Sequence, residues 1–255
     1  MLIRELIDRL LFLVSVPKCV SCGTPLDFGD RGLCKPCLLD YEEHKTRNCS
    51  RCSRVLSECD CSNFYLKRHS LKKLLKVYRY TTSEQATPWN TLIYSLKQDN
   101  RHDVFDFLAD ELVGVIRNSL DIDGNEGKYL ITNVPRRAAS IREYGYDHAA
   151  EIAKRVSVKL GIEYAKLLVS RAKRPQKGIH GDERLKNAVF DYKPGKSRSL
   201  KGLTVILVDD VVTTGASMGY CASLIRGMGT RRIVGASVSI AYKDSYIRPV
   251  PEFHK

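Results

Sequence analysis

Apolar residues recur along the chain in two patterns, one with helical spacing and one as short continuous runs. Spacing of three to four residues predicts helices that begin at Thr87–Pro88 and that cover 104–116, 147–160 and 217–228. Short apolar runs rich in β-branched side chains predict strands over 74–80, 129–132, 164–169, 203–208 and 233–241. Because these strands and helices alternate, the pattern predicts an α/β fold in which helices cover both faces of a parallel sheet.

The first sixteen residues place their apolar side chains on one face of a helix. Those side chains are Ile3, Leu6, Ile7, Leu10, Leu11 and Val14. Charged residues interrupt the segment, and its longest uncharged run, from Leu10 to Pro17, is too short to span a bilayer. We therefore expect an amphipathic helix over residues 1–16 that packs on the rest of the protein, no signal peptide, and a cytoplasmic location. The alternative is that this helix lies on a membrane surface.

Eight of the nine cysteines lie between Cys19 and Cys61, in four closely spaced pairs. The pairs are Cys19/Cys22, Cys34/Cys37, Cys49/Cys52 and Cys59/Cys61. The thiolates of such a pair reach one tetrahedral metal ion at about 2.3 Å, so eight thiolates complete two four-cysteine zinc sites. We expect a double zinc ribbon over residues 17–63. Its zinc should be structural, because closed sites leave no open coordination position.

The spacing leaves open how the pairs group around the two ions. Sequential grouping, which places the first two pairs at one zinc ion and the last two at the other, is the simpler choice. Interleaved grouping is also compatible with the spacing. Reactive or redox-active cysteines are a further alternative. His44 lies between the pairs. Because the cysteines already complete both sites, we expect His44 to face solvent.

The charge balance favours polyanionic partners. Lysine and arginine number 42 and aspartate and glutamate 29, which gives a formal charge of +13. Two zinc sites, each with two positive and four negative charges, lower this to about +9, so the chain stays basic and suits nucleic acid, phosphorylated molecules or an acidic membrane surface.

Residues 64–80 contain no acidic residue, and Tyr65, Tyr78 and Tyr80 lie among their cations. Basic and aromatic side chains together bind single-stranded nucleic acid through phosphate pairing and base stacking. The alternative is a solvated linker followed by a strand. The candidate DNA-binding cations are Lys67, Arg68, Lys72, Lys73, Lys76 and Arg79.

The segment 205–217 combines a buried strand, two carboxylates, a turn of small residues and the start of a helix. In open α/β sheets, ligands bind at the carboxyl ends of the strands, where Asp209 and Asp210 follow the apolar run. The turn leads into a helix N-terminus, whose free N–H groups bind phosphate. Gly215 permits close approach of the backbone, and the carboxylates suit the hydroxyl groups of an attached sugar. The predicted binding residues are Asp209, Asp210, Val211, Val212, Thr213, Thr214, Gly215, Ala216 and Ser217.

This segment resembles the phosphoribosyl pyrophosphate (PRPP) signature of type I phosphoribosyltransferases. That signature is an apolar strand, two acidic residues, two apolar residues and Thr-Thr-Gly-x-Thr/Ser. The resemblance implies a type I phosphoribosyltransferase-like domain over residues 64–255. It also implies that Asp209 and Asp210 hold the ribose 2- and 3-hydroxyls, that the turn 213–217 holds the 5-phosphate, and that magnesium bridges the pyrophosphate and the ribose.

Cysteine pairs followed by this signature resemble the ComF family of competence proteins over nearly the whole chain. The run Val134-Pro135-Arg136-Arg137 follows a strand, where that family has a proline and a basic pair. Further along, Gln176, Arg184 and Asn187 fit the family's Gln…Arg-x-x-Asn run. The run 145–148 reads Gly-Tyr-Asp-His instead of the usual Gly-Phe-Asn-Gln, although Asp147 still suits the cap of the following helix.

Type I relatives carry a mobile loop over the active site, between two strands. The basic segment 171–184 lies at the corresponding position in this chain, also between two predicted strands. Its cations suit either a departing pyrophosphate or a DNA backbone, and a solvated loop is the alternative. The candidates for contact with pyrophosphate are Arg136, Arg137, Lys173, Gln176 and Arg184.

The family resemblance implies a role in handling single-stranded DNA during natural transformation. It implies PRPP or a related phosphoribosyl compound as ligand, and a competence helicase or other DNA-processing proteins as partners. The alternative is an active phosphoribosyltransferase that transfers 5-phosphoribosyl from PRPP to an unidentified nucleobase-like acceptor. We identify no element in the sequence that would recognise a nucleobase. The residues therefore do not decide whether the protein catalyses phosphoribosyl transfer.

Overall fold

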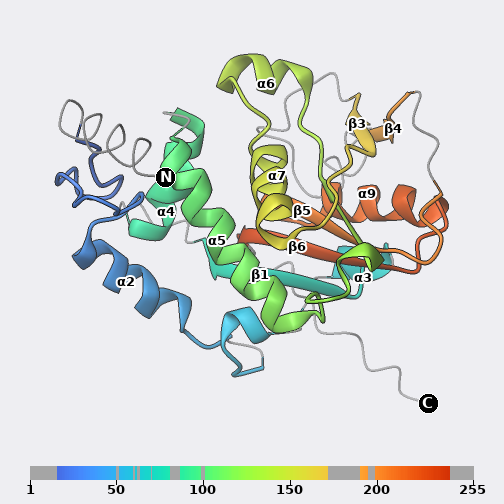
Figure 1. The fold of residues 1–255 in the computed structure, drawn as a ribbon, viewed down its shortest axis with the longest axis horizontal. Helices are drawn as coiled ribbons and strands as arrows, with labels where there is room; N and C mark the ends of the chain where they lie inside the picture. The colour runs from blue at the N-terminus through green and yellow to red at the C-terminus, as the bar shows by residue number, and fades with distance from the viewer. Residues whose placement is uncertain are drawn as a thin grey trace.

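The computed structural model describes residues 16–49, 52–59, 61, 64–69, 71–80, 87–98, 101–171, 190–194 and 199–241. These residues form a four-stranded sheet in which every pair of neighbouring strands is parallel (Figure 1). The strands lie in the order β1 (Lys73–Arg79), β6 (Arg232–Ile240), β5 (Thr204–Val212) and β2 (Tyr129–Asn133). The predicted parallel sheet is therefore confirmed.

Strand β5 lies between two neighbours and is buried on both faces. Val205 and Leu207 point into one hydrophobic layer, and Ile206 and Val208 point into the other. All four side chains are fully buried. Burial on both faces explains why this strand reads as a continuous apolar run instead of an alternating one.

Helices cover both faces of the sheet, as the sequence predicts (Figure 1). On one face lie α5 (His102–Ser119) and α7 (His148–Leu160), and on the other lies α9 (Ala216–Gly227). The short helix α3 (Phe64–Arg68) packs on α9, and α4 (Pro88–Gln98) packs between α5 and α2 (Lys35–Lys45). The remaining described elements are η1 (Leu56–Glu58), η2 (Glu126–Lys128), α6 (Ala138–Tyr144), β3 (Leu168–Ser170) and β4 (Phe190–Tyr192).

The ends of helix α7 agree with the sequence analysis. The Oδ1 atom of Asp147 accepts a hydrogen bond from the N–H of Ala150 over 3.2 Å, which is the expected N-terminal cap. The helix ends at Gly161, which has a left-handed φ of 67° that glycine adopts without a steric penalty. Both termini of the helix are thus set by local sequence.

The predicted strand over 164–169 differs from the observed structure. Tyr164 forms a single parallel bridge with Ile131 of β2, and only Leu168–Ser170 forms a strand, antiparallel to β4. The chain leaves the sheet between these points, because the N–H of Leu167 faces the hydroxyl of Thr132 at 3.5 Å instead of a backbone carbonyl. A polar side chain of β2 therefore ends the pairing, and the apolar pattern does not reveal this.

Helix α2 docks the cysteine-rich segment on the sheet. The buried Tyr41 donates its hydroxyl to Oε2 of Glu111 on α5 over 2.9 Å. His44 is also buried; its ring stacks on Trp89 at 3.8 Å between centroids, and its Nε2 atom donates to the carbonyl of Arg79 over 2.7 Å. The expectation that His44 faces solvent is therefore wrong. Its role is packing, which the cysteine count alone could not show.

The N-terminal amphipathic helix stays a prediction, because residues 1–15 lie outside the described part of the chain. Among the helices that are described, none combines the length and the apolar character needed to cross a bilayer.

Candidate ligand pocket and metal centres

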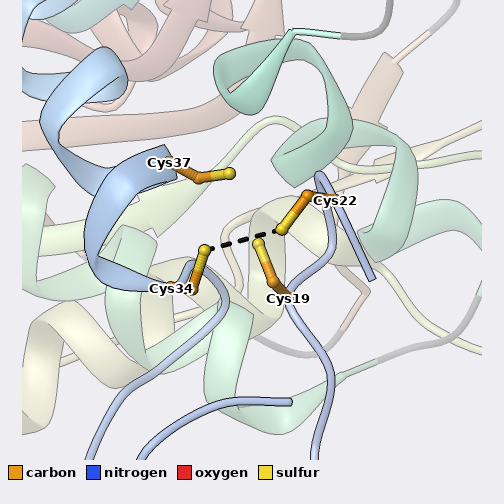
Figure 2. A group of neighbouring side chains, drawn as sticks. All are labelled: Cys19, Cys22, Cys34 and Cys37. Atoms are coloured by element: carbon orange, nitrogen blue, oxygen red, sulfur yellow. Dashed lines mark hydrogen bonds between the residues drawn. The ribbon is translucent and has the colours of Figure 1, made fainter. Parts of the chain in front are cut away.

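The first cysteine cluster consists of Cys19, Cys22, Cys34 and Cys37 (Figure 2). A backbone bridge between Lys18 and Pro25 closes the loop that carries the first pair. Cys34 is the N-cap of helix α2 and Cys37 lies in its first turn, so the second pair is placed by the helix start. The four sulfur atoms all lie within 4.8 Å of one another, and those of Cys22 and Cys34 are 3.5 Å apart.

The second cluster consists of Cys49, Cys52, Cys59 and Cys61, whose sulfur atoms also lie within 4.8 Å of one another. A backbone bridge between Asn48 and Val55 closes its first loop, in which Ser53 adopts a left-handed φ of 56°. The two groups are consecutive in sequence. Sequential grouping of the cysteine pairs is therefore confirmed, and interleaved grouping is wrong.

Four convergent sulfur atoms suit tetrahedral zinc, which prefers thiolate ligands and is structural when all four positions are filled by protein. Burial raises the pKa of Cys59 to about 12, and burial also raises the pKa of Cys37. Hydrogen bonding with Thr24 lowers the pKa of the exposed Cys22 to about 6. A metal ion binds the thiolates, so its arrival must release protons from the buried members of each cluster.

A pocket of about 130 Å³ lies where β5 ends and α9 begins. It is lined by Asp209, Val211, Val212, Thr213, Thr214, Gly215, Ala216, Ser217 and Met218. Gly215 has a φ of 77°, a left-handed conformation that favours glycine and that turns the chain from the strand into the helix. A pocket for a whole ligand usually holds about 300–1,000 Å³. This one therefore fits a single group, such as a phosphate, at the helix N-terminus.

The two adjacent carboxylates have different surroundings. Both lie within β5, which continues to Val212, and only Asp209 lines the pocket. The Oδ1 atom of Asp209 accepts from the N–H of Asp210 over 3.0 Å, and that of Asp210 accepts from the N–H of Val211 over 2.8 Å. Burial, together with the neighbouring carboxylate of Asp210, raises the pKa of Asp209 well above its usual value.

Asp210 contacts a cation from the loop after β2. Its Oδ2 atom accepts a hydrogen bond from Nη2 of Arg136 over 2.7 Å, in an ion pair whose side chains are only 20% and 10% exposed. Nδ1 of the buried His148 lies 3.9 Å from the same oxygen. The structure thus brings the predicted residues Arg136 and Asp210 together. It places Arg137 elsewhere, with its guanidinium on the hydroxyl of Ser140.

A polar network behind this ion pair escaped the sequence analysis. Tyr164 donates its hydroxyl to Oδ1 of the buried Asn133 over 2.7 Å, and Oδ2 of Asp147 accepts from the N–H of Arg136 over 3.3 Å. Asn133 also approaches Oδ2 of Asp147 at 3.4 Å. The one available signal was the polar Asn133 at the end of an apolar strand. The network positions the loop that carries Arg136.

The remaining pyrophosphate candidates, Lys173, Gln176 and Arg184, lie outside the described residues. At the start of this segment, Nε of Arg171 pairs with Oδ2 of Asp191 over 2.8 Å. The guanidinium of Arg171 therefore has a carboxylate partner on β4.

The basic run before and within β1 divides into exposed and buried cations. Lys67, Arg68 and Lys72 are exposed, whereas Lys73 and Arg79 are half-buried. Lys76 is 1% exposed, so its ammonium cannot reach DNA, and its place among the candidate DNA contacts is wrong. The side chain faces the protein interior because it lies in a strand whose two faces are both covered.

The aromatic residues of the basic run also differ from the expectation. Tyr78 is fully buried, which excludes it from base stacking. Tyr80 is half-buried, and its hydroxyl lies 2.5 Å from that of Tyr94. The side chain of Tyr65 is not among the described ones.

Known proteins resemble this chain in both sequence and domain type. The phosphoribosyl transferase domain family matches residues 145–251. Competence protein F of Haemophilus influenzae is 24% identical over 85% of this chain and 93% of its own length. DNA utilization protein YhgH of Escherichia coli K12 is 23% identical over 87% of this chain and 96% of its own length. A solved purine phosphoribosyltransferase from Pyrococcus horikoshii aligns with 58% of this chain and 94% of its own, at 16% identity and a TM-score of 0.33. The sequence relatives and the domain match confirm the resemblance to the ComF family and the phosphoribosyltransferase-like fold.

Proposed function

We propose that this ComF-like protein binds PRPP or a related phosphoribosyl compound at the start of α9, and that it handles single-stranded DNA during natural transformation. The observation that carries the proposal is the pocket lined by Asp209 and by residues 211–218. It joins a helix N-terminus, three hydroxyl side chains and a carboxylate at the carboxyl end of a central strand, where α/β proteins bind ligands.

The pocket and the side chains beside it suit different parts of a phosphoribosyl ligand. The N–H groups of the turn before α9 and the positive end of its dipole suit the 5-phosphate. The carboxylate of Asp209 suits a ribose hydroxyl as hydrogen-bond acceptor. Magnesium, when bound, would supply positive charge for the pyrophosphate, and the carboxylate of Asp209 would be available to hold such a hard cation. Arg136, across the ion pair from Asp210, offers a further cation for the pyrophosphate.

Calorimetry tests the ligand proposal directly. We expect PRPP with magnesium to bind the wild-type protein, and Asp209→Asn to lose at least tenfold in affinity. Asp40→Asn, an exposed carboxylate on α2, is the matched control and should bind as the wild type does. Absence of binding by the wild-type protein, or equal affinity in Asp209→Asn, contradicts the proposal.

The DNA part of the proposal rests on the printed names of the relatives and on the exposed cations. The relatives are a competence protein and a DNA utilization protein. Lys67 and Arg68 end helix α3, and Lys72 follows shortly before β1. The formal charge of +13 favours phosphate contacts. We propose that these three side chains contact the phosphates of a single strand, with a competence helicase or another DNA-processing protein as partner in the cytoplasm.

Transfer of the phosphoribosyl group is the alternative to binding alone. It requires an acceptor, so the decisive measurement is pyrophosphate release from PRPP in the presence of a panel of nucleobases. Release that depends on one nucleobase and on Asp209 would favour the enzyme over the DNA-handling protein. We expect PRPP binding without such release.

A further inference from the structure

Lys76 is a buried lysine in the middle of β1, and its ammonium reaches the second cysteine cluster. The side chain is 1% exposed. Its Nζ atom donates to the carbonyl of Cys59 over 2.5 Å and approaches the carbonyl of Cys61 at 3.4 Å. Leu74, two positions earlier on the same face of β1, shares a hydrophobic layer with Leu56 of the turn η1. Lys76 therefore joins the sheet to the loop that carries the last cysteine pair.

These carbonyls satisfy hydrogen bonds of the ammonium but do not cancel its charge. A lysine is almost never fully buried unless an opposite charge compensates it. Among the ion pairs recorded for the described residues, none includes Lys76. Its ammonium lies instead at the second cysteine cluster, on the carbonyls of Cys59 and Cys61. A negative charge at the second cysteine cluster would compensate the positive charge of the Lys76 ammonium.

Four thiolates around one zinc ion carry a net charge of minus two, by the ligand chemistry of such sites. We propose that Lys76 is the counter-cation of the second thiolate cluster, and that it holds the metal there by compensating this charge and by fixing the loop Cys59–Cys61. It acts through the cysteine ligands and does not bind the metal itself. This role is separate from the proposed PRPP and DNA functions.

The first cluster lacks an equivalent arrangement within the described residues. Lys35, which opens helix α2 beside Cys34, is exposed and pairs with Asp27 over 2.9 Å. Arg101 donates to the carbonyl of Lys18, next to Cys19, but its guanidinium pairs with Asp103 over 2.5 Å. Both nearby cations are therefore neutralised by carboxylates. The first cluster therefore serves as an internal control, because replacement of Lys76 should not change metal binding there.

Site-resolved cysteine protection tests the proposal. Zinc-loaded Lys76→Met is challenged with a chelator and a thiol alkylating agent, and the modified cysteines are identified by peptide mass spectrometry. We expect alkylation 10–100 times faster than in the wild type at the second cluster, a range typical for loss of a residue that supports metal ligands. The first cluster should stay protected. Lys72→Met, an exposed neighbour, should behave as the wild type does.

Lys76→Gln separates charge from hydrogen bonding, because glutamine keeps N–H donors without a charge. We expect it to release metal as Lys76→Met does. Wild-type protection in Lys76→Met, or in Lys76→Gln alone, would overturn the role of the charge. Simultaneous exposure of both clusters with loss of the far-UV circular dichroism would show a general folding role and also overturn the proposal.

Amine labelling of the wild-type protein gives a measurement that needs no variant. In the zinc-loaded protein, Lys76 should resist acylation while Lys72 reacts. After removal of zinc, Lys76 should become reactive together with the second cluster's cysteines. Continued protection of Lys76 in the zinc-free protein would mean that the sheet alone holds it, and would contradict the proposal.

Discussion

The guanidinium of Arg136 contacts the carboxylate of Asp210 over 2.7 Å, while the adjacent carboxylate of Asp209 faces the pocket. The two acidic residues of the motif are therefore not equivalent in the structure. One is held in an ion pair with the loop after β2. The other is half-buried at the pocket, and desolvation together with the neighbouring carboxylate raises its pKa.

This difference predicts opposite effects of two similar substitutions on stability. Asp210→Asn leaves the half-buried guanidinium of Arg136 without its carboxylate and should lower the free energy of unfolding by about 1–3 kcal/mol. Asp209→Asn removes a carboxylate that is costly to ionise in the fold, so it should not destabilise the protein at pH 7. Urea denaturation of both variants measures this, and equal destabilisation would contradict the assignment.

The same pKa shift predicts a pH dependence. The pKa of Asp209 is higher in the folded than in the unfolded chain, so the folded state binds more protons between the two values. The contribution of Asp209 to stability is therefore favourable at low pH and is lost as pH rises through the folded pKa. The wild type should lose stability relative to Asp209→Asn over that rise, which urea denaturation at a series of pH values measures.

Metal analysis should find two zinc ions per chain. Each cluster has four sulfur atoms within 4.8 Å and so completes a tetrahedral site. Apparent binding free energies of about 10–16 kcal/mol in zinc-finger peptides imply that removing the metal unfolds the cysteine-rich segment. The sheet of β1, β6, β5 and β2 should retain its circular dichroism. One zinc ion or none per chain would contradict the two-site assignment.

The affinity for single-stranded DNA should fall with salt concentration, and three side chains should account for part of this dependence. Replacing Lys67, Arg68 and Lys72 with glutamine removes up to three phosphate contacts. The log–log salt slope should then flatten by up to about two units, at about 0.7 per contact. Anisotropy titrations over a salt series measure the slope.

The control for this experiment is Lys73, a less exposed cation of the same basic segment. Lys73 donates to the carbonyl of Ser119 over 3.3 Å and is half-buried, so Lys73→Gln should leave the slope nearly unchanged. A slope that responds equally to Lys73→Gln and to the triple variant would contradict the assignment of the exposed cations.

His69, the residue after helix α3, lies against α9 at Gly219, and this close approach predicts a stability effect. A Cβ atom added at Gly219 would lie 3.1 Å from the His69 ring, whose Nδ1 also contacts the hydroxyl of Ser223 at 3.0 Å. Gly219→Ala should therefore cost about 1–3 kcal/mol in urea denaturation. Gly114 in α5 has open space around it, and Gly114→Ala should instead stabilise the protein by up to about 1 kcal/mol. Equal effects of the two changes would contradict the close approach of His69.

Local pattern was sufficient to predict the sheet, the main helices and the ligand turn. Strand β5 and the caps of α7 follow from apolar runs and from single residues such as Asp147 and Gly161. The cysteine spacing predicted eight ligands for two metal clusters but did not fix their grouping, because the close spacing within each pair is compatible with either grouping. The folded chain decides it by placing Cys34 and Cys37 at the start of α2 beside the first pair.

The wrong predictions concern polar residues whose partners are distant in sequence. Lys76 and His44 look like solvent-exposed residues in a basic or polar segment. Each is buried because a segment 17 or 35 residues away brings a backbone carbonyl to it. Asn133, Tyr164 and His148 were missed for the same reason. The contacts of Asn133 with Asp147 and Tyr164, and of His148 with Asp210, exist only after β2, α7 and β5 have packed together.

The hydrogen bond from His44 to the carbonyl of Arg79 has a consequence for the behaviour of the protein at high concentration. Tyr80 donates its N–H to the carbonyl of Ile240 in β6, so the carbonyl of the preceding Arg79 points to the other side, where β1 has no neighbouring strand among the described residues. An uncovered outer strand offers its backbone groups to other chains and promotes aggregation. By placing His44 and α2 against this outer edge of β1, the cysteine-rich segment shields the sheet from self-association. Removal of that segment should therefore first reduce the solubility of the protein.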